Sequence, residues 1–204
     1  MDKITNIIII EDHPVVRNGL SAFFTATGRW KISGIAASLA EARKLLNAIQ
    51  ADIVLLDIQL EDGWGLDIIP LLVTQSEQKP CSMPLLAVYS AFDDYAHVRA
   101  ALSMGVKVYV TKRRSEQELE DALRKALDGK LYIDEAAQQK LKTITQLFNL
   151  LTKREKEILN LVKHGMSNKE ISFRLDISRR TVENILSCVY DKTGIKSRLE
   201  LERL

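Results

Sequence analysis

Short apolar runs alternate with longer helical patterns from Ile4 to about Gly129, and this alternation constrains the possible folds more than any other feature. Helix start signals lie between the runs, namely Pro14 and the capping boxes Ser38-x-x-Glu41 and Ser115-x-x-Glu118. Such alternation predicts an α/β domain with a doubly wound, five-stranded parallel sheet and helices on both of its faces. The predicted strands are residues 7–10, 30–35, 53–56, 85–89 and 106–110.

Polar side chains follow four of the five predicted strands, directly after the last apolar residue. In a parallel sheet the carboxyl ends of the strands share one edge, and ligand sites lie beyond it. A flavodoxin-like strand order of 2-1-3-4-5 would make the first, third, fourth and fifth strands neighbours. The sequence therefore predicts one site that gathers Glu11 and Asp12, Asp57, Ser90, and Thr111 with Lys112.

Three carboxylates and a lysine determine the chemistry of this predicted site. Carboxylates that share a rim repel one another unless a cation lies among them, and oxygen ligands with room for water suit Mg²⁺. A carboxylate beside Mg²⁺ can attack a phosphoryl group and form an acyl phosphate, which Lys112 and Ser90 could contact. Each acid alone is more simply a loop residue or a helix cap, but their placement after successive strands favours a site.

The charge of the chain is divided unevenly between its two parts. Residues 151–204 contain 12 Lys and Arg against 8 Asp and Glu, whereas residues 1–150 contain 17 against 19. A basic segment beside an acidic one is typical of a nucleic-acid-binding module joined to another domain. No apolar run approaches the roughly 20 residues of a membrane span, so we expect a cytoplasmic protein that does not contact the membrane.

The basic segment has the pattern of a small all-α domain. Thr152-x-x-Glu155 and Ser167-x-x-Glu170 are capping boxes, and a three-residue connection, "DIS", separates the second and third predicted helices, as suits a helix-turn-helix. The predicted helices are residues 153–164, 168–175, 179–193 and 197–203.

The linker before this segment is residues 129–150, and its second half has helical spacing. It could pack on either domain or between two chains. The predicted organisation is therefore a domain at 1–128, a partly helical linker at 129–150 and a second domain at 151–204.

The third helix of the basic segment is predicted to read the major groove of DNA. Its apolar residues form one stripe, which leaves a polar face outward. An asparagine side chain can form two hydrogen bonds with adenine, and a glutamate carboxylate can accept a hydrogen bond from cytosine. Asn184 and Glu183 are therefore the candidates for contacting bases. Any small helical domain also has a polar face, which is the simpler alternative. The predicted DNA-binding residues are Lys169, Arg179, Arg180, Thr181, Glu183, Asn184, Ser187 and Lys192.

The motifs "IIIIEDHP", "VLLDIQL", "VYSA" and "VYVTK" resemble the receiver domain of two-component response regulators, over roughly residues 3–128. The resemblance implies that Asp57 accepts a phosphoryl group from a histidine kinase, with Ser90 as the switch hydroxyl and Lys112 as the phosphate-contacting lysine. Tyr109 matches the aromatic residue that turns inward on activation. The implied Mg²⁺ ligands are Glu11, Asp12, Asp57 and the main-chain carbonyl of Gln59.

Two positions depart from the receiver pattern. Glu61 stands where a proline is frequent, although Gly65 is where a glycine is expected. Arg113 follows Lys112, where the family usually has a proline after a cis peptide bond; a cis bond before any other residue costs about 2.5 to 4 kcal/mol. Neither change removes a reacting group, so ordinary phosphorylation is still expected.

Residues 151–195 resemble the LuxR-type helix-turn-helix that ends NarL/FixJ-type response regulators. The matching pieces are "LTKREKEIL", "GMSNKEI" and "SRRTVE", although Ile185 stands where the family commonly has histidine. The two resemblances together imply a transcription factor, not an enzyme, that binds promoter DNA and dimerises when phosphorylated.

Two rival hypotheses stay open on the sequence alone. An aspartyl-phosphate phosphohydrolase would also use Asp57, but such enzymes place a second aspartate two residues later, where this chain has Gln59. The second rival hypothesis is a DNA-binding protein whose receiver domain no longer accepts a phosphoryl group. The departures from the receiver pattern at Glu61 and Arg113 keep this hypothesis open.

Overall fold

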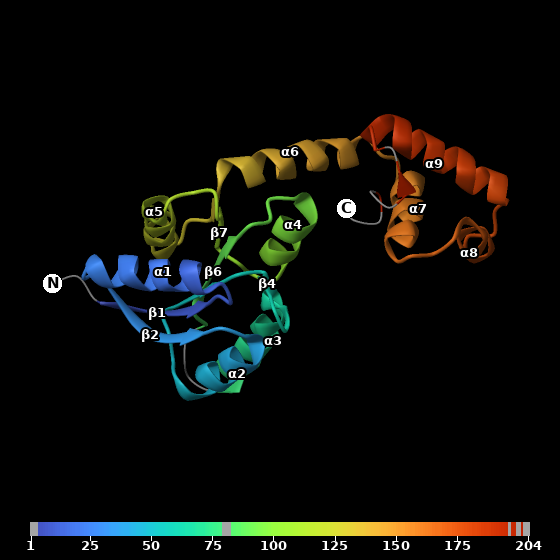
Figure 1. Ribbon diagram of the computed structural model, residues 1–204. Coiled ribbons are helices and arrows are strands. Elements are labelled where there is room, and N and C mark those ends of the chain that lie inside the picture. The colour runs from blue at the N-terminus through green and yellow to red at the C-terminus, as the bar shows by residue number, and fades with distance from the viewer. Residues whose placement is uncertain (1–3, 79–82, 196, 199–200, 202–204) are drawn as a thin grey trace. The chain divides into compact units, whose positions relative to one another are not determined.

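The computed structural model of the protein describes residues 4–78, 83–195, 197, 198 and 201 (Figure 1). The chain divides into two compact units, Met1–Gln138 and Gln139–Leu204, which are described separately. Within the described residues, no helix combines the length and the apolar character needed to cross a membrane.

The N-terminal unit is built on a parallel sheet whose strand order is β2-β1-β3-β6-β7-β8. The first five strands in this order confirm the predicted arrangement. The strands are β1 (Thr5–Ile10), β2 (Trp30–Ala36), β3 (Ile53–Leu56), β6 (Leu85–Ser90), β7 (Val108–Thr111) and β8 (Tyr132–Ile133).

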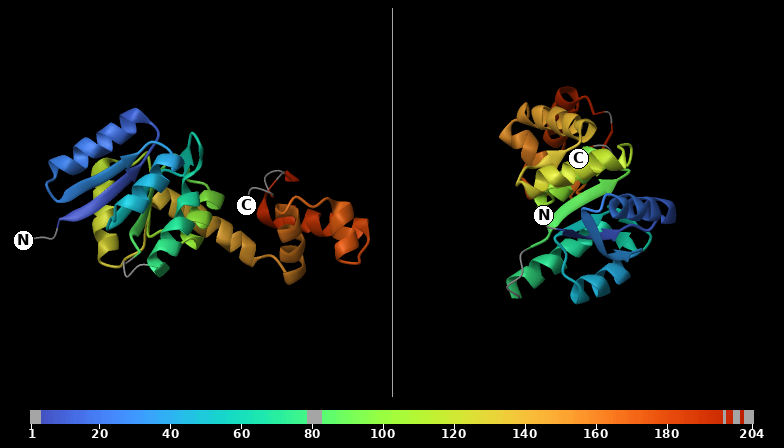
Figure 2. Two further views of the ribbon diagram at one scale, coloured as in Figure 1. Left: turned by 90° about the horizontal axis from the view of Figure 1, so that it is seen from below. Right: turned by 90° about the vertical axis from the view of Figure 1, so that its left-hand side faces the viewer.

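Helices cover both faces of this sheet (Figure 1 and Figure 2). On one face, Leu20 and Phe24 of α1 and Leu119 and Leu123 of α5 pack on alternate strand residues. The opposite face carries α2 and α3. The helices are α1 (Pro14–Ala26), α2 (Leu39–Ala48), α3 (Ile69–Gln78), α4 (Tyr95–Ser103) and α5 (Glu116–Leu127), with a 3-10 turn at Gly65–Ile68.

The sixth strand, β8, was not predicted, so the five-stranded prediction is incomplete. Tyr132 and Ile133 pair in parallel with Val108 and Tyr109. Two half-buried residues carry no readable periodicity, which is why the sequence did not indicate a strand. Beyond it, the buried carboxylate of Asp134 accepts hydrogen bonds from the N–H groups of Thr111 (2.7 Å) and Ala137 (3.0 Å).

A small antiparallel hairpin follows β3 directly. Its strands are β4 (Gln59–Leu60) and β5 (Gly63–Trp64), and Glu61 and Asp62 form the connection between them. This hairpin was also not predicted from the sequence. It occupies the loop in which Glu61 replaces the frequent proline.

The C-terminal unit consists of helices around one apolar core, as predicted. That core contains Ile158, Val162, Ile171, Val182 and Val189, all fully buried. The helices are α7 (Lys153–Lys163), α8 (Asn168–Arg174) and α9 (Arg179–Thr193), and α6 (Glu135–Asn149) precedes them. Part of the predicted helix at 197–203 lies outside the described residues.

The helix starts follow the predicted caps with one difference. Ser115, Thr152 and Ser167 each form a reciprocal capping box with the glutamate three residues later. At Ser38 only half of the box forms, because the Glu41 carboxylate accepts from the N–H of Ala37 instead.

Gly65 should not tolerate a side chain, because a Cβ there would lie 1.8 Å from the main-chain carbonyl oxygen of Asp57. We expect Gly65→Ala to lower the free energy of unfolding of this unit by about 1 to 3 kcal/mol or more. Urea unfolding followed by tryptophan fluorescence measures this, since both tryptophans, Trp30 and Trp64, lie in the N-terminal unit.

Gly19→Ala is the matched control, because Gly19 lies within α1 and a Cβ there would meet nothing within 4 Å. It should be neutral or stabilising by up to about 1 kcal/mol. Equal stability of the two variants would contradict the close approach at Gly65.

Candidate functional site

The structure brings Glu11, Asp12, Asp57, Ser90 and Lys112 together at the carboxyl edge of the sheet. All four residues of β3 are buried, and the N–H of Asp57 still donates to the carbonyl of Ile10 on β1 (2.9 Å). This pairing extends the strand to the aspartate and fixes where its side chain begins. Ser90 and Thr111 are the last residues of β6 and β7, so these strands end one residue later than predicted.

Asp57 is buried, with 5% of its surface exposed, and both of its carboxylate oxygens are engaged. Oδ1 accepts hydrogen bonds from the Ser90 hydroxyl (2.6 Å) and the N–H of Ile58 (2.6 Å). Oδ2 accepts from the ammonium of Lys112 (2.6 Å). A buried carboxylate needs such partners, and two of these three donors, Ser90 and Lys112, are the groups predicted to contact a phosphoryl group.

The Lys112 ammonium lies between Asp57 and Glu11, whose Oε2 is 2.7 Å away. Burial lowers the pKa of Lys112, but the hydrogen bonds that its ammonium donates to Asp57 and Glu11, together with their negative charges, outweigh this effect, so the pKa is raised. The lysine therefore stays charged. The peptide to Arg113 is trans, and the N–H of Lys112 donates to the carbonyl of Ser90 (2.8 Å), which fixes its main chain without a proline.

Four side chains at this edge offer ligand atoms that all lie within 4.8 Å of one another: Glu11, Asp12, His13 and Asp57. The sequence did not point to His13. Its Nδ1 lies 2.8 Å from Oδ1 of Asp12. The only sequence feature that could have indicated this residue is its position directly after Glu11 and Asp12.

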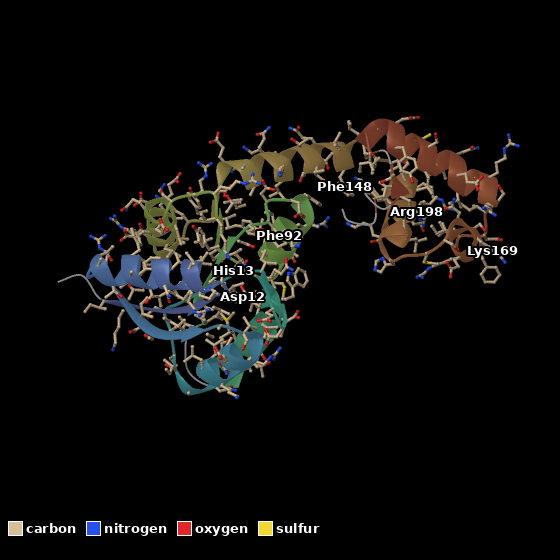
Figure 3. All side chains as sticks on the ribbon, in the orientation of Figure 1. Asp12, His13, Phe92, Phe148, Lys169 and Arg198 are labelled. Carbon is tan, nitrogen blue, oxygen red and sulfur yellow. The ribbon has the colours of Figure 1, made fainter. Side chains whose placement is uncertain are left out.

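A cavity opens over this cluster, and its lining includes Asp12, His13, Asp57, Gln59 and Phe92. Figure 3 labels Asp12, His13 and Phe92. Carboxylate oxygens beside open space with room for water fit a hard divalent cation such as Mg²⁺. The three carboxylates and one ammonium also leave an excess of negative charge that such a cation would neutralise.

Tyr109 lies inward and is fully buried. Its hydroxyl donates to the main-chain carbonyl of Phe92 (2.9 Å), two residues after Ser90. Burial raises the pKa of Tyr109 far above its usual value, with smaller contributions from nearby carboxylates such as Asp94. The phenol therefore stays neutral and keeps its proton for this hydrogen bond.

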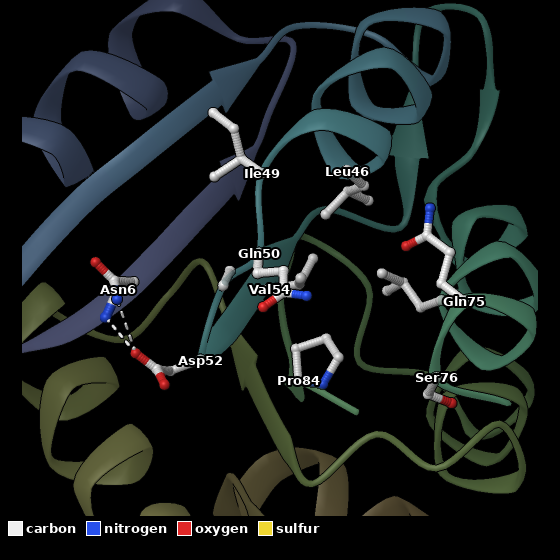
Figure 4. A pocket seen from close by; sticks show the side chains of 11 residues that line it. Asn6, Leu46, Ile49, Gln50, Asp52, Val54, Gln75, Ser76 and Pro84 are labelled. Carbon is white, nitrogen blue, oxygen red and sulfur yellow. Dashed lines mark hydrogen bonds between the residues drawn. The ribbon is translucent and has the colours of Figure 1, made fainter. Parts of the chain in front are cut away.

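A second cavity, of about 350 Å³, lies at the opposite, amino end of the strands between α2 and α3 (Figure 4). There the Asp52 carboxylate accepts from the N–H and the side-chain amide of Asn6 (2.8 and 3.2 Å). None of the predicted site residues lines it. The predicted site residues lie instead around the cavity at the carboxyl edge.

The outward face of α9 has the composition that the sequence predicted. Val182, Leu186 and Val189 are buried, whereas the predicted DNA-binding residues are exposed apart from Lys192. Two of the exposed residues pair with each other: Nε of Arg179 lies 3.1 Å from Oε1 of Glu183. The exposed members are Lys169, Arg179, Arg180, Thr181, Glu183, Asn184 and Ser187.

Lys192 has a structural partner that the sequence did not indicate. Its ammonium donates to both carboxylate oxygens of Glu155, each at 2.8 Å, and Glu155 is buried. The bonds from Lys192 and from the N–H of Thr152 lower the pKa of Glu155. This ion pair joins α7 to α9.

Comparison with known families matches both units. Residues 7–124 match the model of the response regulator receiver domain, and residues 149–204 match that of bacterial regulatory proteins of the luxR family. The chain belongs to the response regulators. It joins a receiver domain to a LuxR-type helix-turn-helix domain, so it is a transcription regulator of the two-component type and not a phosphohydrolase.

Relatives of this response regulator align over nearly the whole chain. The response regulator protein VraR of Staphylococcus aureus (strain Mu3 / ATCC 700698) is 28% identical, over 95% of this chain and 92% of its own length. The oxygen regulatory protein NreC of S. aureus (strain JH9) is 29% identical, over 96% and 94%. The RcsB–DNA complex has the same fold, with a TM-score of 0.72 and 22% identity over 98% of this chain and 96% of that one.

Lys192→Ala should destabilise the helix-turn-helix domain of this response regulator by about 1 to 2 kcal/mol, because Glu155 would lose a charged hydrogen-bond partner. The pKa of Glu155 in the folded protein is below its unfolded value. The stabilisation is therefore complete above about pH 4.3 and is lost as the pH falls through the folded-state pKa.

Hydrogen exchange of the α7 and α9 amides measures this effect, and the difference from wild type should shrink as the pH falls through the lowered pKa of Glu155. Lys169→Ala, at an exposed lysine on α8, is the control and should leave the exchange unchanged. Equal exchange in Lys192→Ala and wild type near pH 7 would show that the pair does not stabilise the domain.

Proposed function

We propose that this response regulator is phosphorylated on Asp57 by a sensor histidine kinase in the cytoplasm, and that phosphorylation promotes its dimerisation on promoter DNA. The observation that carries the proposal is the environment of Asp57. One buried carboxylate has the Ser90 hydroxyl and the Lys112 ammonium each 2.6 Å from one of its oxygens. A hydroxyl and an ammonium can both donate hydrogen bonds to the negatively charged oxygens of a phosphoryl group.

In the proposed reaction, a carboxylate oxygen of Asp57 attacks the phosphorus of a phosphohistidine. The P–N bond breaks, its electron pair returns to the imidazole, and an acyl phosphate forms on Asp57. Lys112 holds its proton throughout, as its raised pKa favours, and supplies positive charge to the phosphoryl oxygens.

A divalent cation at this edge would neutralise the phosphoryl oxygens, and the residues proposed to hold it are Glu11, Asp12, Asp57 and the main-chain carbonyl of Gln59. The acidic cluster and the cavity beside it support this assignment. Mg²⁺ is the expected ion, since the donors are mainly oxygen.

The proposed switch runs through the segment that follows Ser90. A phosphoryl group adds about −1.5 to −2 charge, which draws the Ser90 hydroxyl and Lys112 toward it. Ser90 is two residues from Phe92, whose carbonyl accepts the Tyr109 hydroxyl. A shift of Ser90 would therefore reach Tyr109 and the start of α4, and a new α4 surface would bias domain docking and dimerisation.

For the output, α9 is proposed to lie in the major groove. Asn184 and Glu183 would read base edges, with Thr181 and Ser187 beside them, and Arg179, Arg180 and Lys169 would contact phosphates. Lys192 would contribute less, since Glu155 already takes two of its N–H bonds. Solved structures of RcsB include two dimers bound to DNA and a promoter complex with a phosphomimetic, which supports DNA as the partner here.

Incubation with Mg²⁺ and a small phosphodonor, followed by intact mass measurement, tests the phosphorylation. Wild type should gain the mass of one phosphoryl group, and Asp57→Asn should gain none, because the amide is not a nucleophile of this kind. No adduct on wild type would favour the rival in which the receiver no longer takes phosphate. An equal adduct on Asp57→Asn would place the acceptor elsewhere.

DNA binding across a salt series tests the groove assignment. Asn184→Ala should relax preference at one base pair by about 1 to 3 kcal/mol, whereas Arg180→Ala should weaken all sequences and reduce the salt slope by about 1. Glu157→Ala, at an exposed residue of α7, is the control and should change neither. Wild-type affinity and specificity in both α9 variants would contradict the assignment.

A further inference from the structure

The β4–β5 hairpin connects the metal-binding edge to two other elements of the receiver. Gln59 lines the cavity with Asp12 and Asp57, and its partner across the hairpin is Trp64. The hairpin itself contains only two pairs, and an isolated hairpin of that size is marginally stable in water. Contacts outside it must therefore hold the Gln59 main chain in place.

The first contact is made by Asp62, in the connection of the hairpin. Its carboxylate accepts hydrogen bonds from the N–H groups of Leu39 (2.8 Å) and Ala40 (3.1 Å), the first two residues of α2. These N–H groups have no partner within their own helix, and the helix dipole favours a negative charge there. The bond from Leu39 is the main reason why the pKa of Asp62 is lowered.

The second contact is made by Trp64, whose ring meets the His97 ring of α4 edge to face, with centroids 6.4 Å apart and planes at 88°. His97 in turn stacks on Phe92, at 4.2 Å and 15°. The Nδ1 atom of His97 lies 2.6 Å from Oδ2 of Asp94, the N-cap residue of α4. Trp64 therefore meets a ring that is fixed from two sides.

These contacts reach different elements of the receiver: Asp62 joins the hairpin to α2, and Trp64 joins it to α4. Neither side chain lines the cavity over Asp57. Together they hold β5 from both sides, and its residue Trp64 pairs with Gln59 across the hairpin.

We propose that Asp62 and Trp64 are positioning residues that set the affinity of the receiver for its divalent cation, by holding the main chain of Gln59 at the cavity. This inference rests on the proposed function, in which that carbonyl is a ligand. A loop that is already ordered loses less conformational entropy when the cation binds. Loss of either contact should therefore weaken cation binding while leaving the phosphoacceptor intact.

Isothermal titration calorimetry of the full chain with Mg²⁺ measures the affinity directly. Asp62→Ala and Trp64→Ala should each raise the dissociation constant about 3- to 10-fold. Trp64→Phe keeps an aromatic ring against His97 and should restore most of the affinity. Asp67→Ala removes one exposed carboxylate from the neighbouring 3-10 turn and is the control for lost charge, with no change expected.

Phosphorylation of the same variants at increasing Mg²⁺ concentration distinguishes weaker cation binding from a damaged phosphoacceptor site. The half-saturating Mg²⁺ concentration should rise in Asp62→Ala and Trp64→Ala, with an unchanged maximal rate at saturating Mg²⁺. A lower maximal rate with an unchanged half-saturating concentration would overturn the inference.

The calorimetry also distinguishes this inference from the proposed function. Binding by wild type with equal affinity in Asp62→Ala and Trp64→Ala would overturn the inference alone. Absence of Mg²⁺ binding by wild type would overturn the cation site of the proposed function and the inference with it. Because Asp62 is an exposed loop residue, its variant gives an answer even if Trp64→Ala does not fold.

Discussion

The ammonium of Lys112 is the charge on which the carboxyl edge of the receiver sheet depends. Glu11 and Asp57 directly follow the buried, apolar ends of strands β1 and β3, and two carboxylates there would repel one another in a poorly solvated place. Lys112 bonds both, at 2.7 and 2.6 Å. The same ammonium holds the proposed phosphoacceptor carboxylate in position and compensates its charge, so the stability of this edge and its proposed chemistry depend on one side chain.

The sequence predicted the parts of this receiver that depend on local pattern. Runs such as "IVLL" identified the strands, and their ends placed Asp57, Ser90 and Lys112 on one edge, because parallel topology leaves few alternatives. It did not predict contacts between distant residues that have no periodic signature. Asp62 caps a helix that begins 23 residues earlier, and Trp64 meets a histidine of α4.

In the helix-turn-helix domain, too, the sequence predicted features with a local pattern but not contacts between distant residues. Capping boxes at Thr152 and Ser167 located α7 and α8, and the apolar spacing of α9 separated its buried face from its exposed one. Charge alone could not distinguish the role of Lys192 from that of Lys169. Only the fold brings Lys192 to the buried Glu155, 37 residues away, and so turns a residue of the basic surface into a link between helices.

The two-residue strand β8 has a consequence for how the receiver ends. Without β8, β7 would be the edge of the sheet, with open N–H and C=O groups of the kind that recruit another chain. The N–H groups of Tyr132 and Asp134 donate to the carbonyls of Lys107 and Tyr109, and the Asp134 carboxylate accepts the N–H of Thr111, the residue before Lys112. A fragment cut at residue 128 would therefore leave β7 with an unpaired edge next to Lys112, whereas a fragment that keeps the first turn of α6 would keep β7 paired with β8.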